Sequence, residues 1–302
     1  MKSLSQHLGE QCASGELQKL FALLAESVKD IAQIIETGRM TGYSGTENVF
    51  GEQQLKLDVA TNDLLVERLR NCPLVSVLAS EELDNEIQCH ADGAYSLAFD
   101  PLDGSSLVDV NFSVGSIFGI YPGKGFMGRT PGEMVAAGIA IYGPKTTFLV
   151  SVGKGTHEYA FHDNDFFLTQ ENMKIAEEGS YFAPGNLRAC AKSPQYKKLV
   201  DFWLEKQYTL RYSGGMVPDV GHILKKGKGI FVYPGYSDAP EGKLRLLFEC
   251  GPMAFLVEQA GGNASDGRVR ILEKKIQLVT QRTPIFIGSK LEVERAVGHF
   301  DV

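Results

Sequence analysis

Several carboxylate side chains lie at the end of an apolar segment of this chain, and one lies inside an apolar segment. Asp100 and Asp103 follow the apolar segment YSLAFD, and Glu81 and Glu82 directly follow LVSVLAS. Glu249 interrupts the apolar stretch LLFECGPMAFLV. An unpaired charge at such a place costs free energy, and a bound divalent cation removes that cost. Oxygen-only ligands indicate a hard ion, Mg²⁺ or Mn²⁺, rather than zinc.

The turn DPLDGSS combines two of these carboxylates with small residues. Pro101 bends the chain after a predicted strand, so Asp100 and Asp103 can flank one metal cluster. A backbone carbonyl between them can serve as a further ligand. The glycine and two serines that follow can present backbone N–H groups, and such a nest of amides binds an anion. Metals beside amides form a phosphate site, so the turn suggests phosphoryl transfer to water.

Each carboxylate also has a purely structural interpretation. Glu81 and Glu82 can belong to a solvated loop, and Asp103 with the following glycine can form a tight turn. Glu249 can pair with Arg245, one turn earlier on the same predicted helix. The complete set favours a shared site, because every member lies at the end of an element or on an apolar helix.

Other motifs carry less information. GKGFMG matches a dinucleotide-binding glycine pattern, but Pro131 and Gly132 follow where a helix should open, so we predict a hairpin or a surface loop. His157 and His162 are the closest pair among six scattered histidines, and we expect structural or surface roles rather than zinc binding. No phosphate-binding P-loop pattern and no G-x-S-x-G nucleophile motif occur in the sequence.

The composition is that of a soluble globular protein with one or two cores. The chain has 302 residues, 43% of them hydrophobic and 22% charged, with a net charge of −7. We therefore expect no nucleic-acid partner, no membrane span and a cytoplasmic location. The five cysteines lack C-x-x-C spacing, so we expect reduced and mostly buried thiols.

The first half of the chain predicts helices followed by strands. An apolar stripe predicts a helix over residues 17–35, capped by Ser14 and ended by Gly38, and a second helix begins near Thr61. Strands are predicted at 74–80, 95–100, 116–121, 136–143, 146–152 and 157–163. Short connections between these strands favour a largely antiparallel or mixed sheet.

A polar stretch at 164–180 suggests a domain boundary. We predict an N-terminal domain over 1–168, which carries the carboxylates, and a C-terminal domain over 169–302. In the second half helices are predicted at 196–206, 217–226, 244–260 and 290–297, and strands at 208–213, 229–234 and 284–289. The whole chain is thus of the α/β (α+β) class.

DPLDGSS, with SEE upstream, resembles the fructose-1,6-bisphosphatase family of Mg²⁺-dependent, lithium-sensitive phosphatases, and the resemblance covers about residues 14–290. The stretches GTHE, APGNLRA, YTLRYSGGMVPDV and KLRLLFE resemble the family's sedoheptulose-1,7-bisphosphatases more closely. The resemblance implies the sugar phosphatase fold, a layered αβαβα sandwich with two mixed-sheet subdomains.

The resemblance also implies roles for particular residues. The implied ligands of two to three Mg²⁺ (or Mn²⁺) ions are Glu81, Glu82, Asp100, the Leu102 carbonyl, Asp103 and Glu249. The implied catalytic residues, beside the attacking water, are Asp58 and Glu82. The implied substrate-binding residues are Gly104, Ser105, Asn186, Arg211, Tyr212, Gly214, Met216, Tyr233 and Lys243.

The implied activity is Mg²⁺-dependent hydrolysis of the 1-phosphate of sedoheptulose 1,7-bisphosphate. Hydrolysis of fructose 1,6-bisphosphate, alone or as a second activity, is the alternative that Tyr233 favours. An inositol phosphate suits Arg211, Tyr212 and Lys243 less well, because these residues fit a second phosphate. A non-catalytic sugar-phosphate sensor is disfavoured by the complete carboxylate set, and a nucleotide-dependent oxidoreductase rests on the weak glycine match alone.

The resemblance further implies a homodimer or homotetramer, in which Arg211 reaches a neighbouring subunit's site. The AMP-inhibited members of the family carry cationic and threonine residues that this chain lacks. It has SGELQ at 14–18, Ala94 before Tyr95, and Pro122 after GIY. We therefore expect weak or absent inhibition by AMP.

Overall fold

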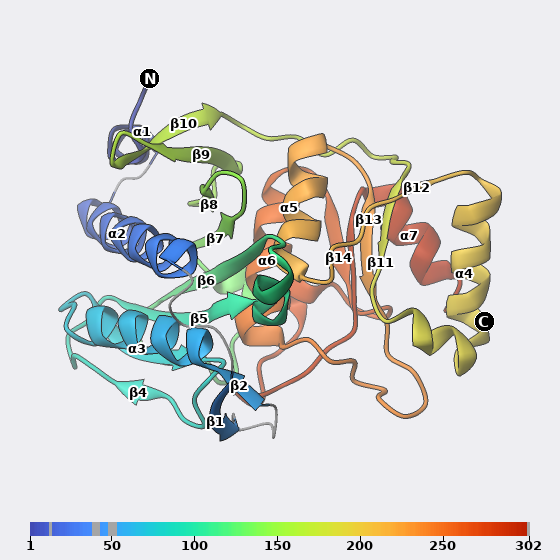
Figure 1. Cartoon of the computed structure of the whole chain (residues 1–302), viewed down its shortest axis with the longest axis horizontal. Helices are drawn as coiled ribbons and strands as arrows, with labels where there is room; N and C mark the ends of the chain where they lie inside the picture. Colours follow the sequence, from blue (N-terminus) through green and yellow to red (C-terminus); the bar gives the residue numbers. More distant parts are fainter. Residues whose placement is uncertain (12–13, 38–42, 48–52, 301–302) are drawn as a thin grey trace.

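Helices and two large sheets alternate in five layers in this computed structural model (Figure 1), which describes residues 1–11, 14–37, 43–47 and 53–300. Helices cover the outer face of an eight-stranded sheet, others lie between it and a five-stranded sheet, and the last pair covers the far side. The predicted mixed α/β fold class is confirmed.

The eight-stranded sheet has the order β10-β9-β8-β7-β6-β5-β3-β4, and only β3 and β5 run parallel. Its strands are β3 (Val75–Ser80), β4 (Ile87–Gln88), β5 (Tyr95–Asp103), β6 (Val114–Pro122), β7 (Ala136–Tyr142), β8 (Thr147–Ser151), β9 (His157–His162) and β10 (Asp165–Gln170). All six predicted strands of this half are confirmed, and β4 was not predicted.

Strand β10 occupies the stretch that the sequence suggested as a polar boundary. Asp163 and Asn164 have φ values of 48° and 64° and join β9 to β10. Two consecutive residues in this left-handed region form the tight turn that suits a twisted hairpin. The Asp-Asn pair indicates this turn in the sequence, and we overlooked it. Phe166, two residues after the turn, is fully buried, so the strand that follows belongs to the sheet and its core.

The helices of the first half are α1 (Leu4–Gln11), α2 (Gly15–Thr37) and α3 (Lys56–Arg70), and a small sheet of β1 (Tyr43–Glu47) and β2 (Gln53–Leu55) precedes α3. The Ser14 hydroxyl accepts the Leu17 N–H at 3.4 Å, so the predicted cap is confirmed. Gly38, the predicted end of α2, lies outside the described residues. The predicted start of α3 near Thr61 was wrong by five residues.

The five-stranded sheet has the order β12-β11-β13-β15-β14. Its strands are β11 (Tyr181–Pro184), β12 (Thr209–Leu210), β13 (Ile230–Tyr233), β14 (Asn263–Ser265) and β15 (Ile285–Gly288). β11 and β14 are short and were not predicted. The strand predicted at 208–213 contains only two paired residues, because the chain then leaves the sheet edge toward the site.

The helices of the second half are α4 (Pro194–Glu205), α5 (Met216–Lys226), α6 (Gly251–Gln259) and α7 (Lys290–Gly298). The helix predicted at 244–260 instead begins as a π-helix over Leu246–Cys250, where the Cys250 N–H reaches the Arg245 carbonyl at 2.9 Å. Pro252 lies in the first turn of α6, where its missing N–H costs little. Short 3₁₀ helices are η1 (Ser105–Val110), η2 (Pro131–Glu133), η3 (Leu187–Ala191) and η5 (Ile271–Glu273).

Apolar side chains fill the three spaces between the layers. One cluster packs α1, α2 and α3 on the first sheet, one packs α5 and α6 between the sheets, and one packs α4 and α7 on the second sheet. The middle cluster joins residues on both sides of the suggested boundary, such as Ile139 and Phe255. The division at 168 therefore stays a prediction. In the parts of the chain that the structure describes, no helix is both long and apolar enough to cross a membrane.

The weaker motifs have structural roles. GKGFMG is a loop after β6, as predicted. His157 and His7 lie near Glu171 in an arrangement that could hold a metal ion. Both nitrogens of His7 have partners, in Tyr159 at 2.6 Å and Glu171 at 3.3 Å. Both nitrogens of His157 also have backbone partners at 3.2 Å, so hydrogen bonding accounts for the group.

The cysteines are less buried than expected. Cys72, Cys89 and Cys190 are half-buried, and only Cys250 of the four described cysteines is fully buried. The expectation of mostly buried thiols was therefore wrong for three of them, because they lie near the ends of elements. Cys12 lies outside the described residues.

Candidate active site

A cavity of about 540 Å³ opens where elements of both halves of the chain meet. The start of α3, the ends of β3 and β5, the turn before η1, the start of α5, strand β13 and the segment 243–249 contribute to its wall. The predicted site residues that line it are Asp58, Glu81, Glu82, Asp100, Leu102, Asp103, Gly104, Ser105, Tyr212, Gly214, Met216, Tyr233, Lys243 and Glu249.

Three carboxylates approach one another at one end of the cavity. One oxygen each from Asp100, Asp103 and Glu249 lies within 4.8 Å of the others, close enough for a common metal ion. Backbone N–H groups orient all three: Asp100 accepts from Leu102 at 2.9 Å, Asp103 from Val217 at 2.7 Å, and Glu249 from Arg245 at 2.5 Å. Glu249, within the π-helix, thus lies beside the end of β5, and the Arg245 backbone N–H is one of its partners.

Crowding and burial raise the pKa values of these acids. Burial, then repulsion from Glu81, Asp103 and other carboxylates, holds the pKa of Asp100 well above its usual range. Burial raises the pKa of Asp103 to about 6 and that of Glu81 to about 7. Bound cations would offset this repulsion, and the all-oxygen donor set fits a hard divalent ion such as Mg²⁺.

Asp58 and Glu82 face the same cavity from two other elements. Asp58 lies in the first turn of α3 rather than before the helix, and its carboxylate accepts the Leu55 N–H at 3.0 Å. This contact explains the early helix start, because an acid in the first turn stabilises a helix N-terminus. Glu82 is the second residue after β3, and its N–H donates to the Ser80 hydroxyl at 3.3 Å.

The turn between β5 and η1 requires glycine. Gly104 has a φ of 76°, and a Cβ there would lie 3.3 Å from the Gly215 Cα and 3.3 Å from Leu107 Cδ1. The absent side chain lets the backbone before α5 approach the carboxylates closely. Ser105 and Ser106 follow as the first residues of η1 and also line the cavity.

The cavity wall also offers cationic and hydroxyl groups. Tyr212, Tyr233 and Lys243 line it, and the Lys243 charge lowers the pKa of Asp103, partly opposing the effect of burial. The segment before α5 is fixed by Asp219, whose carboxylate accepts the Ser213 N–H at 2.8 Å. The cavity thus combines carboxylates suited to cations with a lysine and tyrosines suited to an anion and hydroxyl groups.

Two predicted residues do not line the cavity. Asn186 directly precedes η3 and has a φ of 51°. The exposed Arg211 guanidinium donates to the Leu210 carbonyl at 2.8 Å and lies 5.8 Å from the Tyr181 ring centre. Whether either residue reaches a substrate stays a prediction.

The structure adds residues that sequence reasoning did not assign to the site. Arg245 lines the cavity with 1% exposure, and its Nε lies 3.9 Å from Glu81 Oε1. The sequence signal for Arg245 was a charged residue beside an apolar stretch. We considered this arginine only as a partner of Glu249. The other additional lining residues are Leu55, Asp109, Phe231 and Leu244.

Comparisons with known proteins cover almost the whole chain. The domain families described as "Fructose-1-6-bisphosphatase, N-terminal domain" and "Fructose-1-6-bisphosphatase, C-terminal domain" match residues 3–171 and 175–300. A class 1 fructose-1,6-bisphosphatase of Trichlorobacter lovleyi is 45% identical over 96% of this chain and 92% of its own length. A chloroplastic sedoheptulose-1,7-bisphosphatase of Triticum aestivum is 42% identical over 97% of this chain and 75% of its own length.

A solved structure shows the same fold. The fructose-1,6-bisphosphatase of Leishmania major superposes with a TM-score of 0.94 at 35% sequence identity. The match covers 100% of this chain and 99% of that chain.

Proposed function

Because the chain belongs to the fructose-1,6-bisphosphatase family, and is therefore a sugar-bisphosphate phosphatase, we propose that it hydrolyses the 1-phosphate of sedoheptulose 1,7-bisphosphate. The products are sedoheptulose 7-phosphate and inorganic phosphate. One observation carries the proposal: a carboxylate cluster lines the same cavity as a lysine and two tyrosines. Such a cavity suits a substrate with a phosphate at each end.

The carboxylate cluster holds two or three Mg²⁺ ions in this proposal, and Mn²⁺ suits the same oxygens. The ligands are Glu81, Glu82, Asp100, the Leu102 carbonyl, Asp103 and Glu249. Ions bound there would supply Lewis-acid polarisation of the phosphate and lower the pKa of water.

The protein's own groups position and deprotonate the reactants. The carboxylate of Asp58 or Glu82 accepts the proton of the water that attacks phosphorus, the bond between phosphorus and the sugar 1-oxygen breaks, and that oxygen leaves with the sugar and takes up a proton. Backbone N–H groups of Gly104 and Ser105 hold the phosphate oxygens, where negative charge is distributed in the transition state. Transfer then goes directly to water, and no side chain forms a covalent phosphoryl intermediate.

The cationic and hydroxyl groups of the wall bind the distal part of the substrate. Lys243 provides the charge for the second phosphate, and Tyr212 and Tyr233 provide hydroxyl groups for phosphate and sugar. The backbones of Gly214 and Met216 bound the sugar from the side of α5. A second anion site favours a sugar bisphosphate over an inositol monophosphate.

Fructose 1,6-bisphosphate is the second candidate substrate, alone or together with the seven-carbon sugar. It is supported by the 45% identical relative, whose name is that of a fructose-1,6-bisphosphatase, and by Tyr233. Phosphate release from both substrates, measured side by side with Mg²⁺ and with EDTA, decides between them. We expect a higher kcat/KM for the seven-carbon substrate and no turnover in EDTA, and the reverse preference would contradict the proposal.

Assembly and regulation extend the proposal. Arg211 is exposed in the single chain. This exposure supports a homodimer or homotetramer, in which Arg211 enters the cavity of a neighbouring subunit. Weak or absent AMP inhibition and a cytoplasmic location stay predictions from the sequence. An inhibition curve with AMP half-effective in the low micromolar range would contradict the first of them.

A further inference from the structure

The wall segment 243–249 rests on a second chain segment outside the cavity. The Thr283 N–H donates to the Leu244 carbonyl at 2.9 Å, and the Leu246 N–H donates to the Gln281 carbonyl at 2.8 Å. These two bonds enclose an antiparallel bridge between Arg245 and Arg282. The place of the wall therefore depends on the place of residues 281–283.

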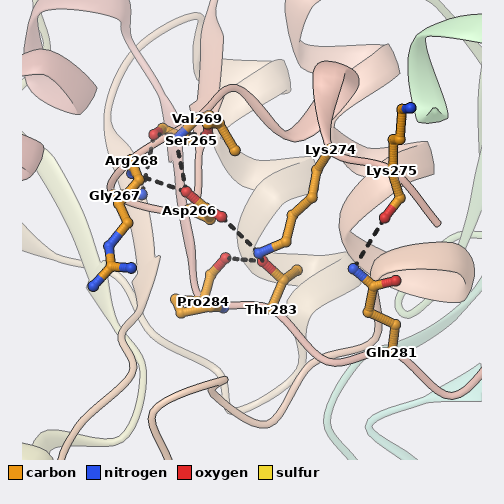
Figure 2. Close-up of polar contacts among 10 residues, drawn as sticks. All are labelled: Ser265, Asp266, Gly267, Arg268, Val269, Lys274, Lys275, Gln281, Thr283 and Pro284. Carbon is orange, nitrogen blue, oxygen red and sulfur yellow. Dashed lines mark hydrogen bonds and ion pairs between the residues drawn. The ribbon is translucent and has the colours of Figure 1, made fainter. Parts of the chain in front are cut away.

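Lys274 connects this supporting segment to the turn after β14 (Figure 2). Its Nζ donates to Asp266 Oδ2 at 2.6 Å and to the Thr283 hydroxyl at 3.0 Å. Asp266 is itself fixed, because its other oxygen accepts the N–H groups of Arg268 and Val269, both at 2.8 Å. The buried Thr283 hydroxyl in turn donates to the Pro284 carbonyl at 3.0 Å.

This ion pair is well shielded from water. The side chains of Lys274 and Asp266 are 18% and 9% exposed. Burial alone would raise the pKa of Asp266, but the hydrogen bonds from Lys274 and the two N–H groups outweigh it, so the pKa lies below its usual value. A shielded ion pair contributes little net stability over apolar side chains of similar size. Its directional hydrogen bonds, however, fix the place of Thr283.

We propose that Lys274 is a positioning residue of the active site, which holds Thr283 and thereby fixes the wall segment 243–249. That segment carries both Lys243 and Glu249, which line the cavity. Neither Lys274 nor Thr283 lines the cavity, so the effect of each is transmitted through the backbone bonds to Leu244 and Leu246.

Lys275 is a matched control on the same segment. It is exposed, and its amine points away from the ion pair in Figure 2. Only its carbonyl takes part, accepting Gln281 Nε2 at 3.1 Å, and a side-chain substitution leaves that bond in place.

The role of the wall in binding substrate and metal rests on the proposed function, so the test includes measurements that need no turnover. Lys274→Met and Thr283→Val remove the link, Thr283→Ser retains the hydroxyl, and Lys275→Met is the control. Each variant is assayed for KM, kcat and the half-saturating Mg²⁺ concentration at a temperature where unfolding is negligible. Mn²⁺ affinity by calorimetry and amide hydrogen exchange over 243–250 are measured in parallel.

We expect Lys274→Met and Thr283→Val to raise KM and weaken metal affinity about 10-fold, as is usual for partners of metal ligands. Because the chemical groups of the site remain, kcat at saturation should change less. Hydrogen exchange at 243–250 should accelerate in these two variants. Thr283→Ser and Lys275→Met should behave like the unaltered protein.

The proposal fails if Thr283→Val matches Lys275→Met in Mn²⁺ affinity and in exchange over 243–250. It also fails if Lys274→Met lowers only the thermal midpoint. If the unaltered protein hydrolyses neither bisphosphate, the proposed function fails, while calorimetry and exchange still decide the role of Lys274. Should Lys274→Met not fold, Thr283→Val, which leaves the ion pair intact, provides the answer.

Discussion

Asp103 joins the two walls of the cavity, since its carboxylate lies in the acidic cluster and accepts the Val217 N–H at the start of α5. We predict that Asp103→Ala lowers kcat at least ~100-fold, by analogy with the loss of one transition-state donor. Initial-rate assays at saturating Mg²⁺ and substrate measure this effect. Asp92→Ala, in an exposed turn, is the control. Near-normal turnover of Asp103→Ala would remove Asp103 from the metal ligands.

Asp219 gives a pH-dependent prediction. Its Oδ2 is buried and has no hydrogen-bond partner among the described residues, and burial raises its pKa to about 6. The unfolded chain has a value of about 3.9. The folded state therefore binds this proton more tightly, and this contribution to the free energy of unfolding is lost as pH rises from about 4 to about 6.

Asp219→Asn does not titrate and retains an oxygen for the Ser213 N–H. Its free energy of unfolding, relative to the unaltered protein, should increase between pH 4.5 and pH 7. Urea titrations in EDTA at several pH values measure the difference, and Asp92→Asn should show no such trend. A difference that is constant or decreasing over this range would show that Asp219 is not held in its acidic form by burial.

At the scale of elements, the turn from β5 into η1 allows a test with a matched pair of glycines. Gly104 and Gly125 have similar φ values of 76° and 73°, but a Cβ at Gly125 would meet nothing within 4 Å. Alanine at either position should cost about 1–2 kcal/mol of stability. Only Gly104→Ala should also lower kcat/KM, because it separates the turn from Gly215. Equal activities of the two variants would contradict a steric requirement at the cavity.

The long helices and strands could be predicted from the sequence, whereas the shortest strands and one helix start could not. The six strands before residue 164 follow from long apolar runs with short connections, and the helices α2, α4, α5 and α7 follow from apolar periodicity. β4, β12 and β14 are only two or three residues long, so their pairing is decided by neighbours rather than by local pattern. The start of α3 was misplaced because one side-chain contact, from Asp58 to Leu55, extends the helix backwards.

At the scale of the whole molecule, the edge of the second sheet supports a prediction about assembly. Leu210 in β12 is 52% exposed beside Arg211, the residue implied to enter a neighbouring cavity. We predict that Leu210→Asp dissociates the homo-oligomer, because a charge would replace apolar contact area. Light scattering after gel filtration measures the mass. Leu204→Asp, at a 61% exposed leucine on α4, is the control. A monomeric unaltered protein would refute the assembly itself.

The site as a whole was only partly predictable. The carboxylates could be found because a charged residue at the end of an apolar segment is visible in a short stretch of sequence. Such a charge is costly without a partner, so it points to a bound cation. The support of 243–249 by residues 281–283 could not, since it depends on backbone pairing between segments about forty residues apart. Asn186 and Arg211 show the converse, because the resemblance assigned them to the site, yet neither lines the cavity of the single chain.

The π-helix before α6 makes the site sensitive to chain length rather than only to side-chain identity. Each residue advances an α-helix by about 100°. Deleting Leu247 would let this turn relax to ordinary α-helical winding, and Glu249 would then point away from Asp100 and Asp103. Natural variation within this stretch should therefore consist of substitutions, while single-residue insertions and deletions accumulate in surface loops instead.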